Sequence, residues 1–387
     1  MVQGTAACHH EIADACLLGT VLDASGRLLD EQVRERLQSD DRMCCHRATA
    51  ILTPQSVNAH APSLVPGVLA YGALPTESVM PHADGQSYLD RTALWPSLPL
   101  AAWHDTYATL HMWTQMVGKI RLALSPPVNH WWHVTLYVTS RGLTTSPIPY
   151  GSRTFTIDFD FLAHHLRLTT SEGGLHTMAL APRAVADFYH ELMALLRTLG
   201  IEVVIRAIPD EVEHPIPFAD DYTHVAYDAA YAQRFWRILV QADRVLQVFR
   251  ARFLGKCSPV HFFWGACDLA VTRFSGRRAP ALPDADAVTR EVASHEESSC
   301  GFWPGSGTIQ APAFYAYMLP TPAGLAQETI RPNSAFWSPE LSQFILLYED
   351  VRQTAAPDDV LLEFFQSTYE AGAKLARWDR TALERGP

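Results

Sequence analysis

Hydrophobic residues after position 104 recur first with the period of a helix. Between 104 and 122 they fall three or four residues apart and share one helical face: Leu110, Trp113, Val117 and Ile120, with Leu124 just beyond. The next residues, "SPPVN", contain two prolines, which cannot continue a helix. We therefore predict an amphipathic helix over 104–122 that ends at a proline turn.

The pattern then changes to the period of a strand and back again. "RTFTIDFDF" alternates strictly, so that the apolar residues of 153–161 lie on one face of a strand. "HLRLTTSEGGLHTMALA" predicts a hairpin that turns at Glu172-Gly173-Gly174. "PRAVADFYHELMALLRTLG" predicts a second helix, with Pro182 near its start and Gly200 at its end. The first half of the chain thus reads helix, antiparallel strands, helix.

The second half repeats this order. "YAQRFWRILVQADRVLQVFRARFLGK" predicts a helix, and "CSPVHFFWGACDLAVTRFSG" a turn followed by a strand. "GFWPGSG", "PAFYAYMLP" and "QFILLYE" predict further strands, and "PDDVLLEFFQSTYEAGAKLARW" a closing helix with proline at its start. We predict an α+β fold with two similar lobes, residues 95–225 and 226–387.

Short matches in the same order indicate that the two lobes arose by internal duplication. Arg121 precedes His130 by nine positions, and Arg252 precedes His261 by nine. A Ser-Pro pair stands before each histidine, and "LYVT" at 136–139 resembles "LAVT" at 269–272. On this interpretation, "SPPVNHWWHV" and "CSPVHFFWGA" are the same device used twice: a proline turn that starts an aromatic-rich strand.

Residues 1–94 differ in composition from the rest of the chain. They hold four of the seven cysteines, few aromatic residues and a stretch rich in Pro, Gly, Ser and Ala. Cysteines and histidines at 8–10, 16 and 44–46 match no standard zinc spacing. We predict a poorly ordered or accessory extension.

Charge and cysteine content limit the partners and the compartment. The formal net charge is −11, which disfavours nucleic acid and anionic membranes because binding to phosphates requires Lys and Arg. The sequence has neither an apolar run of about 20 residues nor a secretory signal. Seven cysteines are few for a chain of this length and are odd in number, so we expect no disulfide framework. We therefore expect a cytoplasmic protein.

Three histidines are candidate metal ligands: His130, His261 and, within "SHEESS", His295. Duplicated turns that meet near a pseudo-two-fold axis would bring His130 and His261 together. Histidines with a carboxylate suit a divalent metal. The alternative is that His130 and His261 are structural histidines satisfied by backbone carbonyls. No G-x-G-x-x-G or P-loop pattern occurs, so no nucleotide cofactor is indicated.

Other residues suit acid-base chemistry and ligand binding. His111, Gln115 and Lys119 form a polar stripe on the first helix, which either lines a cleft or is a solvated edge. We take His111 and Glu296 as acid-base candidates and Arg273 as a clamp for an anionic group, although Arg273 in a structural pair with Asp268 is an equal alternative. Trp132 and Trp303, with Lys119, are candidate ligand contacts, and core packing is the alternative for the aromatic residues.

Several stretches between 95 and 380 resemble a bacterial family, domain-of-unknown-function family 5996. They are "TLHMWTQMVGKIRLALSPPVNHWWHVTLYVTSRGLTTSPIPYG", "FRARFLGKCSPVHFFWGACDLAVTRFSGRR", "SHEESSCGFWPGSG" and "PAFYAYMLP". The resemblance implies no reaction and no site residues.

Three functions therefore stay open. The first is an enzyme that acts on a small organic molecule in an aromatic-lined cleft between the lobes. The molecule is either neutral or anionic, and the reaction proceeds with or without a metal. The second is a non-catalytic small-molecule binding protein, and the third is a structural or interaction module.

Overall fold

A computed structural model describes residues 94–285 and 287–386. Of the expected extension, residues 1–94, only Leu94 is among the described residues. The cysteines and histidines of the extension therefore lie outside them. The described residues belong to one compact unit.

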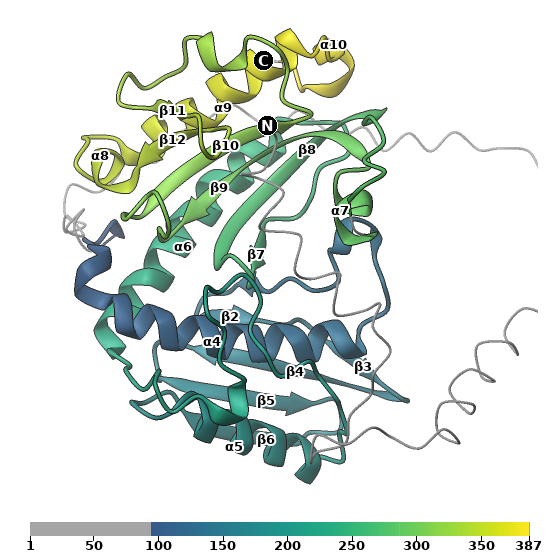
Figure 1. Ribbon diagram of the computed structural model, residues 1–387, viewed down its shortest axis with the longest axis vertical. Helices are drawn as coiled ribbons and strands as arrows, with labels where there is room; N and C mark the ends of the chain where they lie inside the picture. Colours follow the sequence, from purple (N-terminus) through teal and green to yellow (C-terminus); the bar gives the residue numbers. More distant parts are fainter. Residues whose placement is uncertain (1–93, 286, 387) are drawn as a thin grey trace, which may run out of the picture. The chain divides into compact units, whose positions relative to one another are not determined.

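The first half follows the expected order of helix, strands, helix (Figure 1). Its first helix begins four residues before the predicted start, directly after Pro99, and ends at Leu124 before the proline turn. The elements are α4 (Leu100–Leu124), η1 (Asn129–Trp131), β1 (Tyr137–Val138), β2 (Gly142–Thr144), β3 (Ile148–Tyr150), β4 (Arg153–Asp160), β5 (His165–Thr170), β6 (Leu175–Ala179) and α5 (Val185–Thr198).

The second half has the same order with longer strands. Asp228 caps the N-terminus of its first helix by accepting hydrogen bonds from the N–H groups of Ala230 and Tyr231. η2 (Phe218–Asp220) closes the first half. The elements of the second half are α6 (Ala229–Ala251), β7 (His261–Phe263), β8 (Asp268–Arg278), α7 (Ala287–Val292), β9 (His295–Trp303), β10 (Ala313–Leu319), η3 (Leu325–Gln327), β11 (Phe336–Ser338), β12 (Gln343–Leu347), α8 (Tyr348–Arg352), α9 (Pro357–Leu375) and α10 (Arg380–Leu383).

Each half contains one antiparallel sheet. The first has the order β1-β2-β4-β5-β6, with β3 also paired to β4, and the second has the order β11-β12-β10-β9-β8-β7. One residue pair links the sheets: the N–H groups of Leu136 and Phe262 each donate to the other's carbonyl at 2.9 Å. Helices with two antiparallel sheets confirm the α+β class.

The helices cover one face of the second sheet. Phe302 on β9 packs against Phe235 of α6, and Phe314 on β10 packs against Phe365 of α9. Figure 1 shows α6 and α9 on the same side of β8, β9 and β10. Because side chains alternate along a strand, every second residue of these strands points to the opposite face. That opposite face carries a cavity.

Each half also contributes a turn to the helix of the other half. The turn after β7 contacts α4, where the carbonyls of Trp264 and Gly265 accept from His111. The turn after β1 contacts α6, where Trp236 Nε1 donates to the Thr139 carbonyl at 3.0 Å. The two halves are therefore packed reciprocally.

Within residues 94–285 and 287–386, no helix is long and apolar enough to cross a membrane.

Candidate functional site

A cavity of about 540 Å³ lies over the face of the second sheet that α6 and α9 leave open. Its floor consists of side chains from β8, β9 and β10, and its walls come from α4, the η1 turn and residues 211–213. Both halves of the chain thus contribute to it. Ligand sites in proteins are typically concave, mostly apolar and equipped with a few polar groups, and this cavity has that character.

The floor follows from strand alternation. Asp268, Ala270, Thr272 and Phe274 of β8 line the cavity, whereas Leu269, Val271 and Arg273 between them do not. The paired strands continue the same face with Glu297, Ser299 and Trp303 on β9, and with Tyr315, Tyr317 and Leu319 on β10.

Asp268 stands at one end of the floor. It is 9% exposed, and the Tyr315 hydroxyl donates a hydrogen bond to its carboxylate. Burial raises the pKa of Asp268 to about 6, although the Tyr315 hydrogen bond opposes this shift. Burial and the charge of Asp268 in turn raise the pKa of Tyr315.

Glu297 stands at the other end. It is 4% exposed, and its neighbours across the strands are Phe274 on β8 and Leu319 on β10. Burial raises its pKa to about 8, and the charge of Lys256 opposes this shift. Asp268 and Phe274 are six residues apart on β8, so the backbone positions of the two acidic residues lie roughly 20 Å apart along the strands.

Two hydroxyl groups lie between these acids. Thr272 Oγ1 and Ser299 Oγ are 3.0 Å apart and hydrogen-bonded. Ser299 is next to Glu297 on the same face of β9. The Glu297 end of the floor therefore has a carboxyl group beside two hydroxyls, with Phe274 and Tyr317 as aromatic neighbours.

The η1 turn forms the opposite wall. His130 and Trp131 both have left-handed backbone torsions, with φ of 57° and 60°, which residues with a Cβ adopt at a cost of roughly 1 kcal/mol each. This geometry places His130, Trp131 and Trp132 on the cavity wall.

Contacts at both nitrogens determine the tautomer of His130. Nδ1 lies 3.0 Å from the Val292 carbonyl, to which it donates, and Nε2 accepts from Lys256 Nζ at 2.8 Å. Burial, together with the Lys256 charge, lowers the pKa of His130. The Lys256 ammonium also lies over the Trp132 and Phe274 rings, at 5.2 and 4.8 Å from their centroids.

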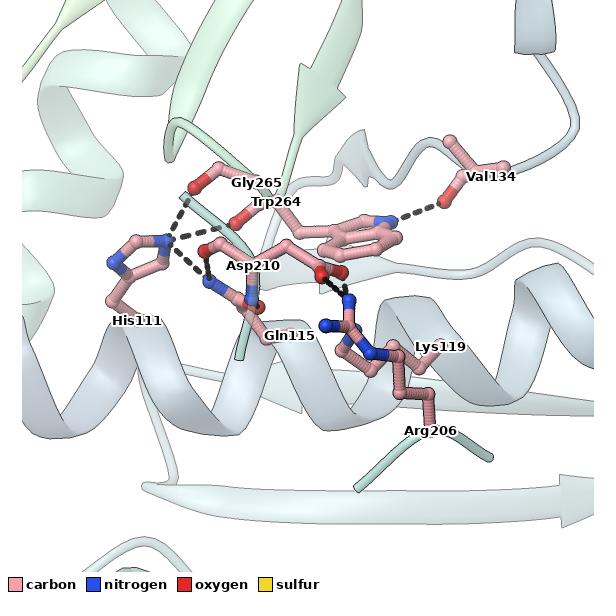
Figure 2. A network of polar contacts seen from close by, with 8 residues as sticks. All are labelled: His111, Gln115, Lys119, Val134, Arg206, Asp210, Trp264 and Gly265. Carbon is pink, nitrogen blue, oxygen red and sulfur yellow. Dashed lines mark hydrogen bonds and ion pairs between the residues drawn. The ribbon is translucent and has the colours of Figure 1, made fainter. Parts of the chain in front are cut away.

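The stripe on α4 lies in a buried network, so the interpretation as a solvated edge is wrong (Figure 2). His111 Nε2 donates to the Gly265 carbonyl at 2.6 Å and lines the cavity. Gln115 exchanges two hydrogen bonds, each of 2.7 Å, with the backbone of Asp210.

Lys119 does not reach the cavity. Its ammonium pairs with the Asp210 carboxylate, which Arg206 also contacts at 2.6 Å. Both Lys119 and Asp210 are 4% exposed. The stripe therefore attaches residues 206–210 to α4, as Figure 2 shows.

The structure does not assemble the predicted metal ligands. The ring centroids of His130 and His295 are 5.6 Å apart, but His261 is 1% exposed and lies against Trp132 and Tyr137. Across the described ranges, no three His, Cys, Asp or Glu side chains are placed to hold a metal ion. Neither ring nitrogen of His261 has a hydrogen-bond partner among the residues that the structure describes, so the alternative of backbone satisfaction is also wrong for this residue.

Arg273 and Glu296 lie away from the cavity, on the other face of the sheet. Arg273 is fully buried, its guanidinium is 3.4 Å from the centroid of the Phe249 ring, and it donates to the Phe249 carbonyl. Glu296 pairs with Arg277 at 2.6 Å and accepts from Ser275. Neither the anion clamp nor the pair of Arg273 with Asp268 occurs, because residues 268 and 273 point to opposite faces of β8.

Of the nine candidate side chains, the cavity wall includes His111, His130, Trp132 and Trp303. The sequence did not identify Glu297 or Asp268 as cavity residues. It also did not show that Tyr315 donates a hydrogen bond to Asp268. A usable signal was present, because the alternation of "DLAVTRF" groups Asp268 with Thr272 and Phe274. The sequence does not show which face of the sheet the helices cover, so it could not show that this group of residues faces a cavity.

Comparison with known proteins gives one result. No curated protein and no solved structure matches the chain. A family model described as a family of unknown function, DUF5996, matches residues 95–385. The match starts at the first buried tryptophan and spans both sheets, the cavity and α10. The chain therefore belongs to the DUF5996 family.

Proposed function

We propose that the cavity over the second sheet binds a small organic molecule. The observation that supports this most directly is the cavity itself: about 540 Å³, walled by aromatic side chains, with two buried carboxyl groups on its floor. A sheet face left open by the helices would otherwise be an unpacked part of the interior. Binding is common to the enzyme and to the non-catalytic alternatives.

An enzyme is the second candidate, and the carboxyl groups are the observation that favours it. Burial raises the pKa of Asp268 to about 6 and that of Glu297 to about 8, which places both near neutral pH, where a general acid or base is most effective. Because they lie at opposite ends of the floor, each would act on a different part of the ligand. The Tyr315 hydroxyl on Asp268 would orient that carboxylate.

We also propose that the two halves arose by duplication. Support comes from the shared order of elements, from the Leu136–Phe262 pair that links the sheets, and from the reciprocal contacts of α4 and α6 with the other half's turn. Superposition of residues 104–200 on 230–378 tests this. Strands after His130 and after His261 in unrelated positions would overturn it.

The cytoplasm as compartment, and a small molecule as partner in preference to nucleic acid or membrane, remain proposals. The net charge of −11 supports the choice of partner, and the three described cysteines, all free thiols, are compatible with a reducing compartment.

Filling the cavity tests the binding function. In Ala270→Trp, an indole replaces a methyl group on the cavity floor, whereas Leu175→Trp adds the same ring at an exposed position of β6. A library of fragment-sized organic molecules is screened against the full chain by saturation-transfer NMR. We expect hits that bind the wild type and Leu175→Trp and are lost in Ala270→Trp. Hits that bind all three proteins equally would reject this cavity as the site.

A further inference from the structure

Glu297 is a buried carboxyl group without a hydrogen-bond donor in the part of the chain that the structure describes. Among the described residues, no N–H or O–H group donates to its side chain, although it is 96% buried and faces the cavity. A carboxylate offers about four acceptor positions, and buried polar groups in folded proteins almost always use theirs. The unused positions point into a space that a ligand can fill.

The charges around the cavity select the kind of ligand. The described residues that line it include four acids, Asp268, Glu297, Glu211 and Glu213, and neither Lys nor Arg. Arg273, the cation expected from the sequence, lies on the far face of the sheet. An anionic ligand would lie beside the buried Asp268 and Glu297 with no Lys or Arg among the described lining residues, which is costly at low dielectric.

Lys256 is the described cation whose charge acts on Glu297, but it does not satisfy the carboxyl group. Its ammonium donates to His130 Nε2 and lies over two aromatic rings, and it forms no ion pair with Glu297 within 4.0 Å. Lys256 is exposed, whereas Glu297 is inside the cavity.

We propose that the molecule bound in this cavity carries a basic nitrogen, an amine or amidine, that pairs with the Glu297 carboxylate. This rests on the proposed binding function and names the chemistry of its ligand. The cationic N–H groups donate to Glu297 and to the adjacent hydroxyl oxygens of Thr272 and Ser299. Phe274 and Tyr317 are the aromatic neighbours of that position on the cavity floor, and aromatic rings attract cations. The apolar part of the molecule lies along the floor toward Trp303.

This pairing has a proton signature. With a pKa of about 8, Glu297 is mostly protonated in the free protein at pH 7, because burial disfavours its charged form. A cation that binds next to it favours the ionised form, so binding releases about nine-tenths of a proton at pH 7. For the same reason the affinity for a cation rises with pH up to about 8 and then levels off.

The experiment uses three probes of one shape and different charge: naphthylmethylamine, naphthylmethanol and naphthoate. Isothermal titration calorimetry on the full chain, in two buffers that differ in ionisation enthalpy, gives both affinity and protons released. We expect the amine to bind at least about tenfold more tightly than the alcohol, with proton release, and the carboxylate to bind most weakly.

Three variants assign the effect to a residue. Glu297→Gln is expected to lose the proton release and at least about tenfold in amine affinity, while keeping alcohol affinity. Glu296→Gln removes the adjacent acid on the other face, and Asp268→Asn removes the acid at the far end of the floor. Both are expected to keep the proton release.

The outcomes separate the two proposals. Equal binding of amine and alcohol, or no proton release by the wild type, overturns the basic nitrogen and leaves the cavity as a site. Proton release that is lost in Asp268→Asn and kept in Glu297→Gln overturns the assignment to Glu297. If none of the probes binds the wild type, both the inference and the binding function that it rests on are rejected.

Discussion

Glu296 and Glu297 are neighbours in the chain, yet their carboxyl groups lie on opposite faces of β9. Glu296 pairs with Arg277 at 2.6 Å and accepts from Ser275, on the side of the sheet that faces the helices. Glu297 lies on the floor of the cavity. Alternation along the strand thus gives two identical side chains different chemistry: one in an ion pair, and one that none of the described side chains or N–H groups contacts as a donor.

Replacing Glu297 by Gln should stabilise the protein at alkaline pH. The pKa of Glu297 is about 8 in the folded chain and about 4.5 when unfolded, so the folded state binds the extra proton between these values. Wild-type stability therefore falls as pH rises through this window, and Gln does not titrate. We expect Glu297→Gln to gain roughly 4 kcal/mol relative to wild type between pH 4.5 and 8.

Urea unfolding at pH 4.5, 6 and 8 measures this gain, and Glu296→Gln is the matched control. The Glu296 pair with Arg277 is partly exposed, so its loss should cost less than about 1 kcal/mol. A stability difference between Glu297→Gln and wild type that does not change with pH would contradict the raised pKa of the buried Glu297 carboxyl group.

His261 should make the protein sensitive to acid. Burial lowers its pKa to about 3, well below the unfolded value of about 6.5, so in this window the unfolded chain binds one more proton. Stability then falls as pH decreases, by up to about 1.4 kcal/mol per pH unit from this residue. His261→Phe should reduce the slope of unfolding free energy against pH on the acid side by up to about 1.4 kcal/mol per pH unit, which corresponds to one proton.

The measurement is unfolding free energy from pH 7 to pH 4. His165→Gln, which changes an exposed histidine on β5, should keep the wild-type slope. If the fall in unfolding free energy between pH 7 and pH 4 is the same in His261→Phe as in wild type, the folded state accommodates a charged His261.

Asp210 should matter more to stability than its partner Lys119. Asp210→Asn leaves a buried ammonium without a carboxylate, and loss of one partner of a buried pair costs roughly 3–5 kcal/mol. In Lys119→Met, Asp210 keeps Arg206 at 2.6 Å, so the cost should be smaller, roughly 1–2 kcal/mol. Chemical denaturation of both variants gives the comparison, and the reverse order would show that Arg206 is no substitute for Lys119.

Two glycines inside helices should respond differently to alanine. At Gly118 of α4 a Cβ would overlap the Trp264 ring, which its hydrogen bond to Val134 holds in place. At Gly372 of α9 the nearest atom is the flexible Met318 Cε at 2.7 Å. We expect Gly118→Ala to lose roughly 1–3 kcal/mol and Gly372→Ala to be neutral or slightly stabilising, since alanine favours helix. Thermal unfolding tests both, and a stable Gly118→Ala would mean that Trp264 can move.

Removal of residues 1–93 should leave the remaining chain folded. The family model begins at residue 95, and Trp95 already packs on Phe314 and Tyr348. We expect a truncation that starts at Leu94 to melt within about 2 °C of the full chain. A drop of more than about 5 °C would show that the first 93 residues stabilise the folded chain.

Periodicity was a good guide to the elements, because burial on one face produces it. The α4 helix and the β4 strand lie where the apolar residues recur, and only their ends differ. "HWWHVTLYVT" was a poorer guide. Its aromatic residues suit a strand, but the left-handed His130 and Trp131 form a turn, so that strand pairing in this stretch begins only at Leu136.

The site was harder to predict, because it depends on contacts between distant segments. The stripe of His111, Gln115 and Lys119 was visible at helical spacing, but its partner Asp210 is 91 residues from Lys119 and lies in an irregular segment without periodicity. Likewise, alternation separated Glu296 from Glu297, but only the packing of α6 and α9 determines which of them faces the cavity.

The exchange of turns between the halves affects how the chain folds during synthesis. Until Trp264 and Gly265 have emerged, His111 on α4 lacks its acceptors and the surface around Gly118 lacks the indole ring that covers it. A newly made first half therefore exposes apolar surface that only later residues can bury. Contacts this distant in sequence slow folding, and exposed apolar surface invites aggregation. We expect ribosome-bound chains shorter than about 265 residues to be protease-sensitive and to engage chaperones that bind apolar segments.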